Sequence, residues 1–338
     1  MLFIIGLSQL ICAVSQAYMP PELSRAVVRQ LQHMPWAGVT PYDLIFPLFV
    51  FISGVSASLS QSRAEAQGIS RLSSVWKLVK RAAFFIGLGV LINLDMLWGW
   101  QNLRYASALG LIGISGLLAG CLSMVLRRWW QRAAAAAGIL LVVGVAQCTC
   151  GTYMPTGCLN AKVDALLCPG RLYLGVVDPA GPLCIVSATA LVLLGMAAGR
   201  LVAIPSRLRS CGWALGVGVG ALAVSMLCGP VIMTMWTPSF VLIGAAWGCM
   251  LLGIFRLLSD GTRGALVALP LRIVGANALA VYAFTHLINY RAAIGNLTQF
   301  LARKGWIAST PITQAAMCLL VAYLFCLYLR RLSPTAKL

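Results

Sequence analysis

Charge is scarce in this sequence. Only 9% of the 338 residues are charged, and only seven are acidic. A soluble globular domain usually carries about 25% charged residues, so this composition excludes an ordinary soluble domain. The chain is instead 60% hydrophobic, with a mean hydropathy of +0.90. We therefore expect an all-α, polytopic integral membrane protein whose apolar stretches cross the bilayer as helices.

The start of the chain lacks the features of a signal peptide. Residues 1–17 have no basic segment before the apolar run and no small-residue cleavage site, which argues against a cleaved leader. The run begins at once and barely reaches the length of a span. We expect the N-terminus to be clipped and residues 1–338 to form a single transmembrane domain.

Apolar runs of near-membrane length recur along the chain. Helices are the only plausible spanning structure here, because every backbone polar group must be satisfied inside the lipid. We expect ten spans, at 1–17, 42–60, 82–98, 105–126, 133–149, 181–200, 211–229, 237–257, 273–290 and 311–329.

The net charge of +18 follows the alternation of the loops. Of the 25 Lys and Arg residues, 17 lie in one set of alternate loops and 8 in the other. The positive-inside rule places the richer set in the cytoplasm. This predicts cytoplasmic termini and outer loops at 18–41, 99–104 and 150–180, which face the periplasm or an equivalent lumen. The excess of Lys and Arg then reflects the orientation of the chain in the membrane, and no nucleic-acid partner is expected.

Four of the twelve cysteines gather in one predicted outer loop. Their spacing could ligate zinc, but an oxidising exterior favours at least one disulfide. Free thiols are the remaining alternative, and we expect no metal. The four residues are Cys148, Cys150, Cys158 and Cys168.

Only two histidines occur, and one of them is grouped with an indole and a carboxylate. His33 precedes Trp36 and Asp43 on the predicted outer side. An imidazole there can accept and return a proton near neutral pH, a carboxylate can orient its ring, and an indole can exclude water. Two ordinary interpretations stay open, namely that His33 is an interfacial loop residue and that Asp43 is a helix N-cap.

Five further polar residues could line a site. Arg104 could bind a phosphate or carboxylate, or only extend to the membrane interface. Asp178 could bond a sugar hydroxyl, or start a helix at its Asp-Pro turn. Asn277 lies in an apolar span and should face a partner helix or a cavity. His286 and Asn289 could face the same pocket, although a buried His286 bonded to a carbonyl is also open.

The segment HMPWAGVTPYDLIFPLFVFISGVSASLS (33–60) resembles the membrane acyltransferases of the heparan-α-glucosaminide N-acetyltransferase family, including bacterial relatives with a DUF5009 domain. Weaker similarity continues over 103–115, 169–195, 235–248 and 273–288. The positions that follow the family pattern in the first segment are His33, Trp36, Gly38, Thr40, Asp43, Phe46, Pro47, Phe49, Phe51, Gly54 and Ser56.

The resemblance implies a chemistry as well as a fold. In that family the histidine is the active-site residue on the luminal or periplasmic face, and acetyl-CoA is the acyl donor. The resemblance also implies a location in the plasma (bacterial inner) membrane and a homodimer. This chain departs from the pattern at Leu111, where an Arg is usual, and at Ala180, where a Glu is usual. Glu22 stands where animal members have an Asn.

The leading hypothesis is a membrane acyltransferase that moves an acetyl group from cytosolic acetyl-CoA to an amino or hydroxyl group of an extracytoplasmic sugar or glycan. His33 and Asp43 would be catalytic, while Trp36, Arg104, Asp178, Asn277, His286 and Asn289 would bind substrate or donor. The alternative is a transporter, or an inactive relative with the same fold. Against transport, the sequence shows no intramembrane acid pair and no evident inverted repeat.

Overall fold

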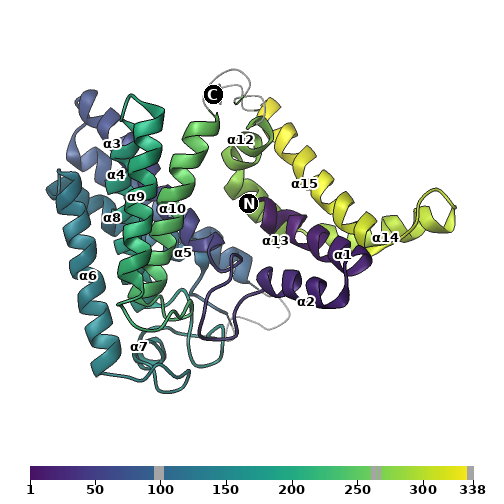
Figure 1. Cartoon of the computed structure of the whole chain (residues 1–338), viewed down its shortest axis with the longest axis horizontal. Coiled ribbons are helices and arrows are strands. Elements are labelled where there is room, and N and C mark those ends of the chain that lie inside the picture. Colours follow the sequence, from purple (N-terminus) through teal and green to yellow (C-terminus); the bar gives the residue numbers. More distant parts are fainter. Residues whose placement is uncertain (95–102, 260–263, 265–267, 333–338) are drawn as a thin grey trace. The chain divides into compact units, whose positions relative to one another are not determined.

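The protein is all-helical in the computed structural model, which describes residues 1–94, 103–259, 264 and 268–332 (Figure 1). The all-α part of the predicted fold class is therefore confirmed. The chain divides into two compact units. Unit 1 comprises Met1–His33, Thr40–Tyr42 and Ser259–Leu338, and unit 2 comprises Met34–Val39 and Asp43–Leu258.

Unit 2 contains most of the long helices, and unit 1 contains the two ends of the chain. The helices of unit 2 are α3 (Ile45–Ala66), α4 (Arg71–Asn93), α5 (Ala108–Val125), α6 (Trp129–Thr149), α7 (Leu159–Leu167), α8 (Pro182–Val202), α9 (Arg207–Ser225) and α10 (Pro238–Ser259). Unit 1 contains η1 (Phe3–Leu7), α1 (Ser8–Tyr18), α2 (Pro21–Gln30), α12 (Leu269–Ala276), α13 (Ala278–Leu287), α14 (Tyr290–Arg303) and α15 (Pro311–Leu332).

Helix α8 forms the centre of unit 2 and packs against α3, α5 and α6. Two glycines let α3 and α8 approach closely. A Cβ atom on Gly54 would collide with the carbonyl oxygen of Val192, and one on Gly195 would collide with that of Phe51. Small residues allow such backbone contact between helices in a membrane, where dispersion forces replace the hydrophobic effect.

Among the described residues, seven helices are long and apolar enough to span a membrane, fewer than the ten spans expected. The seven correspond to predicted spans. They are Ile45–Ala66, Ala108–Val125, Trp129–Thr149, Pro182–Val202, Arg207–Ser225, Pro238–Leu258 and Pro311–Leu332.

The other three predicted spans are not uninterrupted apolar helices, each for a local reason. The 1–17 span is kinked at Gly6, which adopts a φ of 143° inside η1. The 273–290 span is broken at Asn277, between α12 and α13. The 82–98 span belongs to α4, which begins earlier, at Arg71, and carries four basic residues. Positions 95–98 lie outside the described residues.

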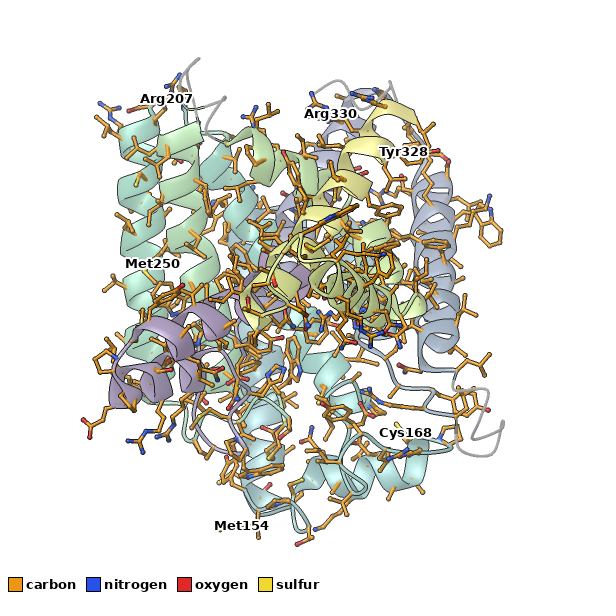
Figure 2. The ribbon with its side chains drawn as sticks, turned by 90° about the vertical axis from the view of Figure 1, so that its right-hand side faces the viewer. Met154, Cys168, Arg207, Met250, Tyr328 and Arg330 are labelled. Carbon is orange, nitrogen blue, oxygen red and sulfur yellow. The ribbon has the colours of Figure 1, made fainter. Side chains whose placement is uncertain are left out.

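The predicted outer loops of unit 2 meet at one end of it. The Trp36 indole N–H donates to the carbonyl oxygen of Tyr153 at 2.7 Å, and the Gly38 N–H donates to that of Val231 at 2.8 Å. In Figure 2, Met154 and Cys168 lie at this end of unit 2 and Arg207 lies at the opposite end. The grouping of the loops agrees with the alternation of charge. The side of the membrane on which these loops lie stays a prediction.

The expected disulfide is wrong, because all twelve cysteines are free thiols. Within the predicted outer loop, the buried Cys158 caps a helix instead of forming a disulfide. Its sulfur accepts the Ala161 N–H at 3.4 Å as the N-cap of α7. Cys148 and Cys150 are exposed at the end of α6. No group of three metal-ligating side chains occurs among the described residues.

Candidate functional site

An ion pair organises the loop end of unit 2. The Arg104 guanidinium donates from Nε to Asp178 Oδ2 at 2.6 Å and from Nη2 to Asp178 Oδ1 at 2.7 Å. The Asp178 side chain is fully buried, whereas 22% of the Arg104 side chain is exposed. This two-point geometry is the strongest form of Arg–carboxylate contact. The sequence singled out both residues but did not predict that they pair.

Local structure holds both partners in place. The Asp178 carboxylate also accepts the backbone N–H groups of Tyr173 at 3.1 Å and Ala180 at 2.9 Å, which closes the turn before α8. Arg104 forms an isolated antiparallel bridge with Gly170, and its guanidinium lies 4.8 Å from the centre of the Tyr173 ring. The turn interpretation of Asp178 is thus confirmed.

A second buried carboxyl group lies behind the pair. Asp164 of α7 accepts the Asp178 backbone N–H on Oδ2 at 2.8 Å, while its buried Oδ1 has no hydrogen-bond partner. A Cβ atom on Gly181 would collide with this carboxyl group, so any larger residue there would displace it. Burial raises the pKa of Asp164 from 3.8 to about 6; the Asp178 N–H bond lowers this pKa, and the Asp178 charge raises it.

This environment makes Asp164 destabilising when ionised. Because folding raises its pKa, the protonated Asp164 carboxyl group stabilises the folded protein. This stabilisation is complete below pH 4 and is lost as the pH rises through about 6. Two pKa units correspond to roughly 3 kcal/mol. We expect Asp164→Asn to raise the thermal midpoint at pH 7.5 and to flatten its pH dependence between pH 4 and 6, measured by tryptophan fluorescence in detergent.

The matched control for this experiment is Glu22→Gln, since Glu22 is exposed on α2. It should retain the wild-type pH slope. An Asp164→Asn protein with an unchanged slope would show that another group governs stability in this pH range.

Further polar side chains are buried between α6, α7 and α8. Gln147 Nε2 donates to Asn160 Oδ1 at 3.0 Å and to the Met235 carbonyl oxygen at 2.9 Å. Asn160 Nδ2 donates to Cys184 Sγ at 3.4 Å. Several buried polar atoms in unit 2 have no partner, which is uncommon in folded proteins. They are Gln147 Oε1, Asp164 Oδ1, Ser187 Oγ, Thr234 Oγ1 and Trp236 Nε1.

In unit 1, His33 is exposed just beyond α2. Its ring meets Tyr42 edge to face, with ring centres 4.8 Å apart at 66°. Thr40 Oγ1 donates to the Gln32 carbonyl oxygen at 2.8 Å, which closes the same short loop. An exposed imidazole can reach a substrate, and the adjoining Tyr42 limits the directions the ring can take.

In unit 2, Asp43 and Trp36 are fixed by backbone contacts. Asp43 is 1% exposed, and its Oδ2 accepts the N–H of Met34, the residue directly after His33, at 3.4 Å. Helix α3 has Leu44 at its N-cap, with no side-chain cap bond. Asp43 therefore lies one residue before the N-cap position, and its role in orienting His33 stays a prediction. Trp36 packs with a small buried cluster around Ile232 and Met235.

The remaining candidates lie in unit 1 and have local partners. Asn277 Nδ2 donates to the Ile273 carbonyl oxygen at 2.9 Å and to that of Cys326 on α15 at 3.4 Å, which confirms the partner-helix interpretation. His286 Nδ1 lies 2.9 Å from the Tyr282 carbonyl oxygen, but the side chain is exposed, so the buried interpretation is wrong. Asn289 caps α14 by accepting the Ala292 N–H at 3.3 Å.

Sequence reasoning missed Asp164, Asn160 and Gln147. A usable signal existed for Asp164, which is one of only seven acidic residues and lies in LNAKVDALL (159–167), the short helix of a predicted outer loop. No comparable signal marked the two amides. At the two departures from the family pattern, Leu111 and Ala180 are buried in the main apolar core.

Comparison with curated proteins finds partial similarity. Heparan-alpha-glucosaminide N-acetyltransferase of Mus musculus is 36% identical over 88 residues, which are 25% of this chain and 13% of that protein. The Homo sapiens enzyme of the same name is 31% identical over 98 residues, which are 28% and 15% of the two chains. The chain is a distant, partial relative of a membrane N-acetyltransferase. No family model matches it, so the resemblance to DUF5009 proteins stays a prediction.

Proposed function

We propose that this protein is a membrane acetyltransferase that uses acetyl-CoA to acetylate an amino or hydroxyl group of an extracytoplasmic sugar. The observation that carries the proposal is the 36% identity over 88 residues to a heparan-alpha-glucosaminide N-acetyltransferase. The seven candidate membrane spans support it, because they match the membrane setting of such an enzyme.

His33 is the proposed proton-handling group. Its imidazole removes a proton from the acceptor amine or hydroxyl as that group attacks the thioester carbonyl. The carbon–sulfur bond then breaks, the thiolate takes up the proton, and the products are the acetylated sugar and free CoA. In the covalent alternative, the imidazole itself attacks the thioester and holds the acetyl group until the acceptor arrives.

Asp43 and Trp36 are proposed to support this histidine. The Asp43 carboxylate accepts the N–H of the peptide that joins His33 to Met34, and this bond restrains the backbone from which the imidazole extends. The bond from the Trp36 indole to Tyr153 joins the same segment to the 150–158 loop. A restrained backbone keeps a catalytic ring near its productive position.

Arg104 and Asp178 are proposed to act as one unit. The buried Asp178 carboxylate already accepts bonds from Arg104, Tyr173 and Ala180. We therefore assign Asp178 to the positioning of Arg104 and not to direct sugar binding. The partly exposed guanidinium is the group available to contact a carboxylate, phosphate or hydroxyl of a substrate.

A transporter is the second candidate, favoured by the helix breaks at Gly6 and Asn277, because interrupted spans often mark substrate sites in carriers. At the first break, however, the carbonyl oxygens of Ile4 and Ile5 accept from Arg291 and Tyr290. At the second, Asn277 bonds the Ile273 carbonyl oxygen. The backbone groups at these breaks are used within the protein, which favours a structural role.

The proposal is tested with the purified full chain in proteoliposomes, supplied with acetyl-CoA and a panel of amino sugars and glycans. We expect CoA release that requires an acceptor, together with an acetylated product of matching amount by mass spectrometry. Uptake of a sugar without CoA release would instead identify a carrier. Neither activity with any acceptor would favour an inactive relative.

A further inference from the structure

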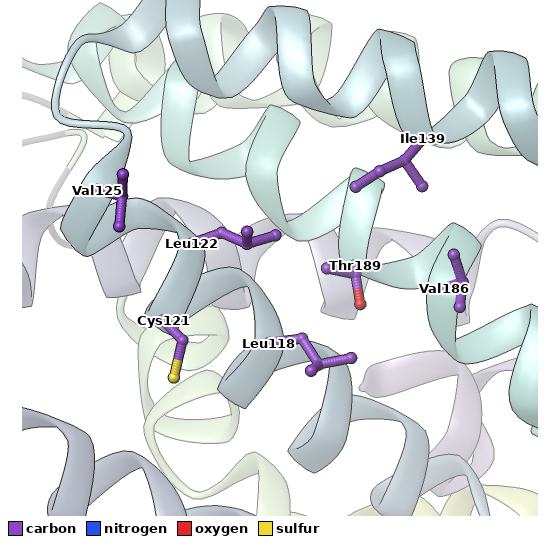
Figure 3. Close-up of a pocket in the computed structure, with 7 residues that line it drawn as sticks. All are labelled: Leu118, Cys121, Leu122, Val125, Ile139, Val186 and Thr189. Carbon is purple, nitrogen blue, oxygen red and sulfur yellow. The ribbon is translucent and has the colours of Figure 1, made fainter.

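An apolar groove runs over three helices of unit 2, α5, α6 and α8, each of which is a candidate membrane span (Figure 3). Its volume is about 440 Å3. The side chains that form it extend from the middle of α6 and the first half of α8 to the last residue of α5. The main lining residues are Leu118, Leu122, Val125, Ile139, Val186 and Thr189.

The lining offers no polar partner to a ligand. Thr189 carries the one hydroxyl group in it, and this hydroxyl donates to the Ile185 carbonyl oxygen at 2.8 Å. The other groups that face the groove are aliphatic, apart from the Cys121 thiol. All three helices are long and apolar enough to span a bilayer. The groove therefore suits an apolar occupant at the depth of the hydrocarbon.

The size of the groove fits an acyl chain better than it fits a helix of a partner protein. A helix with its side chains is about 10 Å wide and would need a face extending over several turns. A volume of about 440 Å3 holds about fifteen groups of ~30 Å3, the volume of a water molecule in the liquid. Since a methylene group has a similar volume, one acyl chain fills the groove.

A basic and aromatic turn follows one end of the groove. Val125 is the last residue of α5, and the Arg127 N–H donates to its carbonyl oxygen at 3.1 Å. Arg128 follows, and Trp129 begins α6. The turn is held by Arg132, whose Nε donates to the Leu126 carbonyl oxygen at 2.9 Å.

This turn has the chemistry of a phospholipid headgroup site. Arg127 and Arg128 are exposed, and within the described part of the chain neither forms an ion pair. Guanidinium groups bind phosphate oxygens through two bonds at once. Trp129 and Trp130 are each 48% exposed, as is typical of indoles at the boundary between hydrocarbon and headgroups.

We propose that this groove binds one acyl chain of an anionic glycerophospholipid, with Arg127 and Arg128 on its phosphate. The apolar lining selects the chain, and the two cations select the charge of the headgroup. The loop that carries them belongs to the set predicted to be cytoplasmic, the side where anionic lipids give the membrane surface its negative potential. The site does not depend on the proposed acetyl transfer.

Native mass spectrometry of the delipidated full chain, returned to phosphatidylglycerol or phosphatidylethanolamine, tests the proposal. We expect wild type to retain one phosphatidylglycerol and to melt at a higher temperature in its presence. Leu122→Trp, which fills the groove, should retain at least fivefold less. Arg127→Gln with Arg128→Gln should retain both lipids equally. Leu118→Phe repeats the groove-filling test should the tryptophan variant not fold.

The matched control is Leu141→Trp, because Leu141 of α6 is 68% exposed and does not line the groove. It should behave as wild type does. Equal retention by wild type and both groove-filling variants would overturn the proposal. It would also be overturned by a dimer of this chain that Leu122→Trp dissociates, since a second copy would then cover the groove.

Discussion

His33→Ala should lower acceptor-dependent CoA release by 100-fold or more. General acid–base catalysis contributes on the order of 10²–10⁴-fold to a reaction rate, and the only other histidine, His286, already has a local carbonyl partner. The His33 side chain is exposed, so its removal leaves no cavity and the fold should be retained. The measurement is the initial rate of CoA release with acetyl-CoA and the best acceptor of the panel.

The control for this substitution is Gln30→Ala, three residues earlier and also exposed. It should keep the wild-type rate, and both variants should match wild type in thermal midpoint. Added imidazole should restore part of the rate to His33→Ala where the histidine acts as a base. An unaltered rate in His33→Ala would remove this residue from catalysis, while acetylation by another group would remain open.

The grouping of loops at one end of unit 2 was predictable because it follows from charge and hydropathy alone. Each long apolar run must cross the bilayer once, so alternate loops lie on the same side. The contacts of Trp36 with Tyr153 and of Gly38 with Val231 agree with that rule. The rule gives only the side, however, and not which side chains within a group of loops touch.

The broken spans were not predictable from hydropathy, because averaging over a window hides a single residue. Gly6 adopts a φ that other residues rarely adopt, and Asn277 replaces a backbone donor with its own side-chain amide. The Arg104–Asp178 pair and the burial of Asp164 depend on contacts across 74 and 14 residues of sequence. Periodicity and local motifs carry no information over such separations.

Asp178→Asn should destabilise the protein by about 3 kcal/mol, within the range observed when one partner of a buried ion pair is removed. The amide keeps the shape of the side chain, but Arg104 loses its two charged acceptors. Arg104→Gln should cost at least as much, because it leaves the fully buried Asp178 carboxylate without a cation. Unfolding by a graded denaturing detergent measures both effects.

The double variant Arg104→Gln with Asp178→Asn separates the structural role of the pair from a role in binding. With both charges gone, the loss of stability should be smaller than the sum of the two single losses, by 1 kcal/mol or more. If the pair only holds the turn before α8, recovered stability should bring recovered activity. If Arg104 also contacts a substrate, the double variant should be stable but keep a raised KM with a nearly unchanged kcat, which is the pattern of lost ground-state binding. We expect the second result, because about a fifth of the Arg104 side chain remains exposed beyond its contacts with Asp178.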